Sequence, residues 1–195
     1  MSFITTWFTG YHNPIRFADN LRNRSASFWG LYAQILRGLL DSFFIYLPAA
    51  LLGWQPHTPS FLTFIPIETY YRSLIFLSPL VFLVEWLLGA IVIHVFIRLC
   101  KKESDIDQIL NITGLAGLVI AAFLVIWDWF WFFIGFSDQY FLGISHLVID
   151  IWWFVLVVYC FKRILGLPVY LSIIGCLLAF IFCIPYAVII MRAPF

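Results

Sequence analysis

The chain has 195 residues, of which 64% are hydrophobic and only 11% are charged, whereas an ordinary soluble domain carries about 25% charged residues. This composition excludes a soluble globular domain and predicts an all-α, polytopic integral membrane helix bundle. The formal net charge of +1 argues against nucleic acid as a partner, because a phosphate-binding surface needs clustered Lys and Arg in excess.

The first 25 residues differ from the apolar remainder of the chain. Aromatic side chains stand there among polar and basic ones, which favours a position along the cytoplasmic headgroup layer, with a poorly ordered tail as the alternative. Pro14 interrupts any single continuous helix in this segment. We therefore divide the chain into a cytoplasmic N-terminal segment, residues 1–25, and a transmembrane domain, residues 26–195.

Five apolar stretches approach the length of about 20 residues that crosses a bilayer. They cover residues 36–54, 73–99, 110–135, 143–161 and 167–191. Positive residues in short connections favour the cytoplasmic side, and here they alternate along the chain. One predicted side carries Arg16, Arg22, Arg24, Arg98, Lys101, Lys102, Lys162 and Arg163, and the other carries only Arg72 and Arg192. Five crossings then give a cytoplasmic N-terminus and an exterior C-terminus, with the cell inner membrane as the expected location.

The connection before the third stretch contains a helix-start pattern. Ser104-Asp105-Ile106-Asp107 resembles a capping box with Asp in place of the usual Glu, so the helix should begin inside this connection. His94 lies near the cytoplasmic third of the second stretch, and we expect it to be a satisfied packing or interfacial histidine rather than a ligand.

Four titratable residues lie inside the apolar stretches, namely Glu85, Asp128, His146 and Asp150. An ionised carboxylate in hydrocarbon costs at least a few kcal/mol, so such groups face the protein interior or a water-filled cavity. Counted along the helices, they lie about 16 to 27 Å from the predicted cytoplasmic ends. Helix packing can therefore unite them in a site for a cation, a proton or a polar solute. The alternative is a structural role, in which hydrogen-bonded acids fix the register of the helices.

Two further pairs have the spacing of one helical turn. His146 and Asp150 are close enough in sequence to hydrogen-bond or to hold a proton or cation jointly. Arg37 and Asp41 are predicted to form a buried ion pair within one helix, with the Arg reaching toward the headgroups.

Small residues follow the acids along two of the stretches. Gly89 shares a helix face with Glu85, and Gly114, Gly117 and Ala121 share one with Asp128. Small residues let helices approach closely in lipid. We expect these faces to pack against other helices, either within the chain, in a homo-oligomer or against another membrane protein.

The sequence contains no recognisable catalytic signature. A His-Glu-x-x-His zinc motif, a Gly-x-Ser-x-Gly elbow and a Walker loop are all missing, and the four cysteines lack the paired spacing of a metal site. We therefore expect no enzyme activity, no metal and no cofactor, with an intramembrane hydrolase as a minor alternative. The tryptophans at 127, 129, 131, 152 and 153 are assigned to an interface belt rather than to a substrate cavity.

The chain from about residue 13 onward resembles the Yip domain family of five-span membrane proteins. The resemblance is strongest across residues 91–128. It rests on the run from His94 to Lys102, the run from Ser104 to Gly114, and Trp127-Asp128-Trp129. It implies five transmembrane helices and a cytoplasmic N-terminus.

Eukaryotic members of the Yip family interact with Ypt/Rab GTPases and carry a longer N-terminal region with an Asp-Leu-Tyr-Gly-Pro motif. This chain has neither, so it looks more like the compact prokaryotic branch, and a Rab-type GTPase is not expected as a partner. The leading hypothesis is a non-enzymatic, membrane-organising or partner-binding scaffold surrounded by lipid. The competing hypothesis is a small transporter or a proton- or cation-binding protein that uses the acidic residues.

Overall fold

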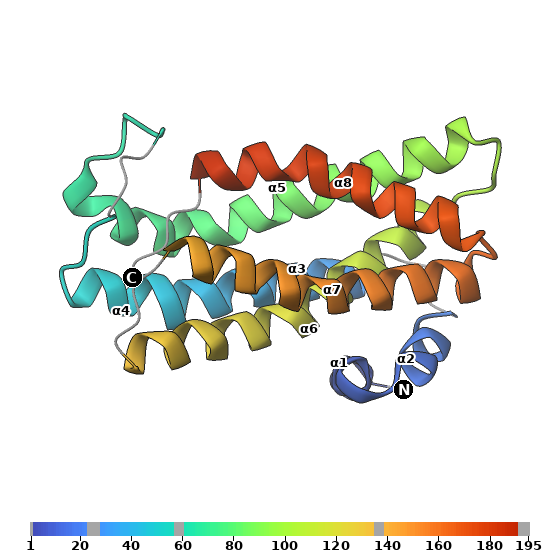
Figure 1. Ribbon diagram of the computed structural model, residues 1–195, viewed down its shortest axis with the longest axis horizontal. Coiled ribbons are helices and arrows are strands. Elements are labelled where there is room, and N and C mark those ends of the chain that lie inside the picture. Colours follow the sequence, from blue (N-terminus) through green and yellow to red (C-terminus); the bar gives the residue numbers. More distant parts are fainter. Residues whose placement is uncertain (1, 23–27, 57–60, 135–138, 191–195) are drawn as a thin grey trace.

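The computed structural model describes residues 2–22, 28–56, 61–134 and 139–190, and every regular element in these ranges is helical. Two short helices precede a bundle of long ones (Figure 1). The elements in chain order are α1 (Phe3–His12), α2 (Pro14–Leu21), α3 (Phe28–Asp41), the π-helix η1 (Ser42–Tyr46), α4 (Leu47–Leu51), the 3-10 helix η2 (Ile67–Thr69), α5 (Tyr70–Leu99), α6 (Ile106–Phe133), α7 (Gln139–Ile164) and α8 (Val169–Ile190).

Four helical stretches of the described residues are long and apolar enough to cross a membrane, which is consistent with an integral membrane protein. They are Phe28–Leu51, Ile67–Leu99, Ile106–Phe133 and Phe141–Ile164. These stretches confirm the first four predicted spans as helices, although the first begins at Phe28 rather than at residue 36. The apolar stretch Val169–Pro185 in α8 is shorter, so a fifth crossing is still a prediction. The predicted ends at Gly135 and Met191 lie outside the described residues.

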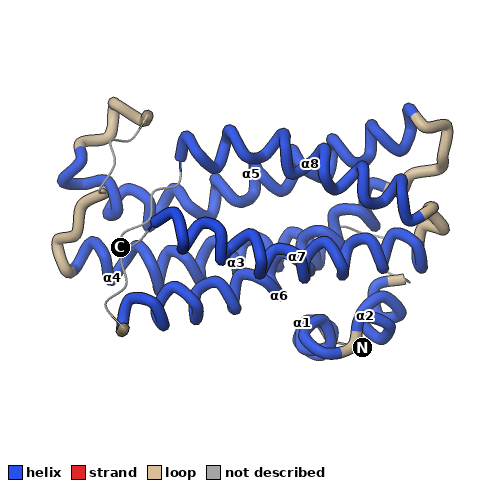
Figure 2. Tube along the Cα trace, viewed as in Figure 1, coloured by secondary structure: helices blue, strands red, loops and turns tan. Residues whose placement is uncertain are grey.

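The long helices run along the same axis of the bundle (Figure 2). A helix satisfies its own backbone hydrogen bonds, which is required where no water is present to do so. On α5, large apolar side chains are exposed at intervals of three or four residues, namely Phe76, Leu80, Val84, Leu87, Ile91 and Val95. This spacing makes an outward-facing apolar stripe, as expected of a helix that contacts lipid.

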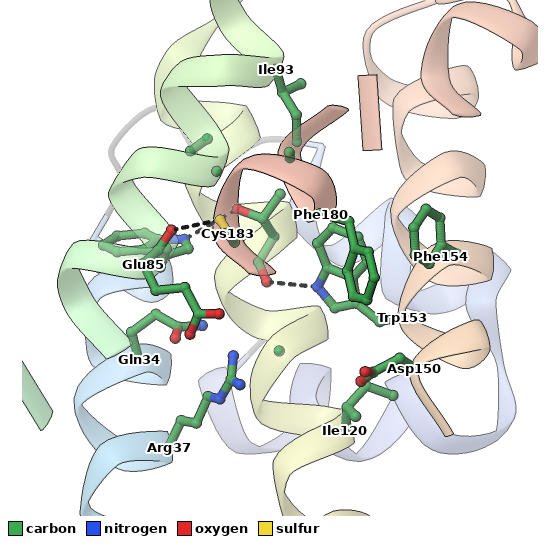
Figure 3. Close-up of a pocket in the computed structure, with 16 residues that line it drawn as sticks. Gln34, Arg37, Glu85, Ile93, Ile120, Asp150, Trp153, Phe154, Phe180 and Cys183 are labelled. Carbon is green, nitrogen blue, oxygen red and sulfur yellow. Dashed lines mark hydrogen bonds between the residues drawn. The ribbon is translucent and has the colours of Figure 1, made fainter. Parts of the chain in front are cut away.

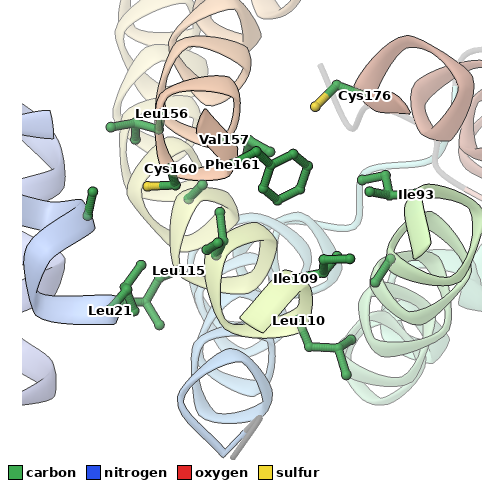
Figure 4. Close-up of a cluster of buried hydrophobic side chains, with 14 of the residues drawn as sticks. Leu21, Ile93, Ile109, Leu110, Leu115, Leu156, Val157, Cys160, Phe161 and Cys176 are labelled. Atoms are coloured by element: carbon green, nitrogen blue, oxygen red, sulfur yellow. The ribbon is translucent and has the colours of Figure 1, made fainter. Parts of the chain in front are cut away.

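The apolar core lies where α5, α6, α7 and α8 meet (Figure 4). Ile93, Ile109, Leu156, Phe161 and Cys176 are each no more than 1% exposed. Leu21 of α2 is also fully buried in this core, so the N-terminal helices are packed onto the bundle rather than detached from it.

The helices α3 and α6 cross closely, and this crossing depends on two glycines. A Cβ added to Gly30 would overlap the carbonyl of Leu110, and one added to Gly114 would lie 2.6 Å from the Cα of Gly30. The Gly30 amide donates to Asn111 Oδ1 at 2.9 Å. Because the first amides of a helix have no partner within it, Asn111 of α6 satisfies the start of α3.

A second close crossing joins α3 to α5. Gly38 faces Pro79 with no room for a Cβ. Beside it, the Ser42 hydroxyl donates to the Gly38 carbonyl at 2.8 Å and lies 2.8 Å from the Ser78 hydroxyl. The π-helical turn η1 begins at Ser42. The Trp129 indole of α6 donates to the Phe44 carbonyl of this turn at 2.7 Å.

The helices α1 and α2 are separated at Asn13 and Pro14, which confirms the predicted interruption. Figure 1 shows α1 lying across the direction of the long helices. Gly10 packs on Val119, and the Tyr11 ring lies 5.2 Å from the Phe123 ring. These α6 residues lie about 14 to 20 Å along the helix from residue 110, the predicted cytoplasmic boundary of the third span.

The helix α2 is held at the end of α7. The Arg163 guanidinium donates to the Asp19 carboxylate at 2.8 and 3.0 Å, and Arg22 donates to the Arg163 carbonyl at 2.8 Å. The α5–α6 and α7–α8 connections lie at the same end of the bundle (Figure 1). Described basic residues of the three predicted cytoplasmic groups are therefore gathered at one end, whereas Arg24 lies outside the described residues.

The start of α6 differs in detail from the predicted capping box. The helix does begin inside the connection, but the N-cap is Asp105, whose carboxylate accepts from the amides of Asp107 and Gln108 at 3.0 and 3.2 Å. Ser104 instead lies 2.9 Å from His94 Nδ1. The Ser104 hydroxyl is thus occupied by the histidine, and the neighbouring carboxylate caps the helix.

We predict that Gly30→Ala lowers the free energy of unfolding by about 1–3 kcal/mol, because the added methyl group overpacks the α3–α6 crossing. Reversible unfolding in mixed micelles measures the change. Gly143→Ala is the matched control, since a Cβ there meets nothing within 4 Å. Equal destabilisation by the two substitutions would contradict the role assigned to this crossing.

We also predict that Asp19→Asn loosens α2. The hydrogen bond from Arg163 lowers the pKa of the Asp19 carboxyl, so the contact is complete above the ordinary range of an aspartate and is lost as the pH falls through the lowered value. Because the pair is exposed, hydrogen-exchange protection of residues 14–22 should fall only roughly two- to fivefold in the variant. Glu103→Gln, at an exposed position, should leave it unchanged; equal protection in both variants would refute the docking role.

Candidate functional site

A cavity of about 140 Å³ lies between α3, α5, α6, α7 and α8 (Figure 3). The polar lining of the cavity includes Glu85, near the middle of α5, and Asp150, near the middle of α7. Gln34 and Arg37 of α3 also belong to this polar lining. The cavity therefore brings charged side chains from three helices to the centre of the bundle.

Within the described part of the chain, two oxygen atoms at this cavity have no hydrogen-bond donor. They are Gln34 Oε1 and Glu85 Oε2, both buried. Gln34 is only 1% exposed, and its amide nitrogen already donates to the Gly114 carbonyl at 3.0 Å. A buried acceptor without a donor costs free energy, so these two oxygens are positioned to accept from a bound molecule.

Arg37 does not form the predicted ion pair with Asp41. Among the described residues, the ion pairs are His146 with Asp128 and Arg163 with Asp19. The Arg37 guanidinium carbon instead lies 4.3 Å from the centre of the Phe82 ring and lines the cavity. The aromatic face and the cavity acids offer this cation a favourable environment, so the side chain turns inward instead of reaching for the headgroups.

Asp128 and His146 form a direct pair between α6 and α7. His146 Nε2 lies 2.6 Å from Asp128 Oδ1, and the side chains are 30% and 14% exposed, respectively. A neighbouring hydrogen bond from Trp127 Nε1 to Ser145 Oγ, at 2.7 Å, joins the same two helices. The histidine therefore bonds across the helices rather than along α7 to Asp150.

The predicted four-residue cluster is thus divided. Glu85 and Asp150 line the cavity, whereas Asp128 and His146 are paired with each other. None of these four side chains is fully buried; all have intermediate exposure. Asp150 is within electrostatic range of both Arg37 and His146.

The aromatic wall of the cavity was not predicted, because Trp153 had been assigned to the interface belt. Its indole nitrogen donates to the Thr113 carbonyl at 3.4 Å. Trp86 donates to the Leu110 carbonyl at 3.2 Å and to Thr113 Oγ1 at 3.1 Å. Both indole N–H groups are therefore directed at α6, and each ring contributes aromatic carbon to the lining.

Gln34 was also missed by sequence reasoning. It lies one helical turn before Arg37 and therefore on the same helix face, but the predicted first span began at residue 36. Extending that span back to Phe28 would have placed this amide inside the apolar region and one turn from the Arg37 cation. The polar face of α3 was the signal that could have identified it.

The predicted packing residues are in contact with different neighbours. A Cβ on Gly117 would lie 2.8 Å from the Gln34 amide nitrogen, so Gly114 and Gly117 both face α3. A Cβ added to Gly89 would lie 3.5 Å from Cys183 Sγ of α8, an ordinary contact distance. Ala121 is 3% exposed. Asp128, by contrast, faces α7.

The described residues contain no group of three or more His, Cys, Asp or Glu side chains arranged to hold a metal ion. Comparisons with protein families, curated proteins and solved structures found no match for this chain.

We predict a coupling free energy of about 1–3 kcal/mol between Asp128 and His146 in a double-mutant cycle of Asp128→Asn and His146→Gln. The physical reason is the short, mostly buried hydrogen bond between α6 and α7. Unfolding in mixed micelles provides the four free energies. The matched cycle of His146→Gln with Asp150→Asn should give a smaller coupling; a larger one would show that the histidine's main partner lies on its own helix.

Proposed function

We propose that this protein binds a small polar solute in the central cavity and carries it across the membrane. The observation that carries the proposal is the pair of buried, donor-free oxygens of Gln34 and Glu85 at a cavity that also holds Arg37 and Asp150. Ionisable groups inside a membrane bundle are costly and are typical of ion and substrate paths. A pocket with a few convergent polar groups is also the usual form of a small-molecule site.

Irregular helices around the cavity support transport rather than static binding. The π-helix η1 directly follows the α3 segment that carries Gln34 and Arg37. Pro79 lies inside α5 on one side of Glu85, and Pro185 lies inside α8. A proline inside a helix removes one backbone hydrogen bond and favours a kink, and such positions allow one part of a helix to move relative to the other.

The other hypotheses from the sequence have less support. Self-association of a scaffold was expected through the small-residue faces, but Gly114 and Gly117 are already covered by α3 of the same chain. A hydrolase needs a nucleophile activated by a neighbouring base. At the cavity, the Thr113 hydroxyl and the Cys183 thiol donate instead to backbone carbonyls, those of Ile109 at 2.8 Å and Glu85 at 3.5 Å. We therefore place the function in the cavity.

The proposal includes five crossings, with α8 as the fifth, and a cytoplasmic position for the end of the bundle that carries Arg22 and Arg163. Positive residues gathered at one end support this orientation. The same proposal includes the resemblance to the Yip domain family and the location in the inner membrane. Under this orientation the cavity lies near the middle of the membrane.

Cysteine labelling tests this function with a native probe. Cys183 lines the cavity, so a variant that retains only this cysteine should react with a charged, membrane-impermeant methanethiosulfonate in reconstituted vesicles. We predict a reaction from both sides of the membrane, because a carrier opens its site to each side in turn. A variant retaining only Cys176, which is fully buried outside the cavity lining, should stay unmodified.

The outcomes of this labelling separate three cases. Reaction of Cys183 from both sides supports a carrier. Reaction from one side alone supports a wet binding site but overturns transport. Protection of Cys183 from both sides, equal to that of Cys176, overturns the proposed function altogether.

A further inference from the structure

We infer that the solute held in the cavity is a primary ammonium ion with a short apolar body. The inference rests on the proposed function and adds the chemical class of the solute. Three observations carry it, namely the hydrogen-bonding capacity left open in the cavity, the balance of its charges and the composition of its wall.

The open hydrogen-bonding positions are acceptors. Gln34 Oε1 and Glu85 Oε2 lie on α3 and α5, and neither has a donor. Figure 3 shows the two side chains next to each other on one side of the cavity. A primary ammonium group presents three N–H donors, so one such group can satisfy both oxygens. A quaternary ammonium ion, a carboxylate or a halide ion has no donor to offer.

Acidic side chains outnumber basic ones in the cavity lining. Arg37 is a basic group, whereas Glu85 and Asp150 are two acids. With both acids ionised, a single positive charge on the solute brings the sum of these charges to zero, and burying unbalanced charge is costly. A zwitterion would leave the excess in place, and an anion would increase it.

The remaining wall is aromatic. Trp86 and Trp153 direct their indole N–H groups at α6, and Phe154 and Phe180 meet edge to face at 6.0 Å across α7 and α8. Aromatic faces attract an organic cation and accept its hydrocarbon body. The cavity of about 140 Å³ is well above the roughly 10–15 Å³ that one water needs, so it has room for a small organic solute.

The test uses the full chain in lipid nanodiscs and n-butylammonium as the probe, with binding measured by titration calorimetry. Saturable binding is expected, and it should be weaker by about tenfold or more for 1-butanol, butyrate and tetramethylammonium, which each lack either the charge or the donors. Glu85→Gln should weaken butylammonium binding by about tenfold or more for the same reason. Asp150→Asn is a second variant for the case in which Glu85→Gln fails to fold.

Glu103→Gln is the matched control, because this acid lies on the exposed α5–α6 connection; binding should be unchanged in it. Equal binding of tetramethylammonium, preferential binding of butyrate, or binding that persists in both cavity variants would overturn the inference. Absence of amine binding while Cys183 reacts from both sides of the membrane overturns the solute class but leaves the proposed function standing. Protection of Cys183 from both sides overturns both the solute class and the proposed function.

Discussion

The close approach of α3 to α6 is the constraint on which the centre of this molecule depends. Without a side chain on Gly30 or Gly114, the two helices meet backbone to backbone, and the Gly30 amide is capped by Asn111 at 2.9 Å. This fixed crossing sets the height and rotation of α3. Gln34 and Arg37, one and two turns further along, are thereby directed into the cavity. In a bilayer, where apolar burial gives little preference for one helix neighbour over another, such packing and hydrogen bonds determine the arrangement.

Charged walls are costly in such a bundle, and partial compensation between opposite charges lowers that cost. Arg37 contributes to this balance because it lies over the Phe82 ring and near the cavity acids, without a direct ion pair. A buried ion pair gains Coulomb energy but loses hydration, and the two terms nearly cancel. An arginine held by an aromatic face keeps its donors available. The arrangement is therefore better suited to exchanging partners than a closed Arg37–Asp41 pair would be.

Much of the architecture could be predicted from the sequence, because apolar length and the spacing of basic residues depend on the bilayer rather than on particular contacts. The helices over the first four spans and the break at Pro14 followed from such local signals. The site was harder to predict. Depth along a helix correctly marked Glu85 and Asp150 as inward residues, but depth says nothing about rotation, and Asp128 turned out to face α7. The Arg37 pairing failed because spacing of one turn permits a contact without requiring it.

The glycines of α6 show how packing and function are linked here. A side chain at position 117 would collide with the Gln34 amide, whose nitrogen donates to the Gly114 carbonyl. With that nitrogen bound to α6, the amide oxygen of Gln34 has a fixed direction and meets no donor from the residues that the structure describes. The same small residues that permit a close crossing therefore also orient a polar group toward the cavity. In a membrane protein, a small-residue face on one helix can thus serve an internal site through its neighbour, and self-association is not the only reading of such a pattern.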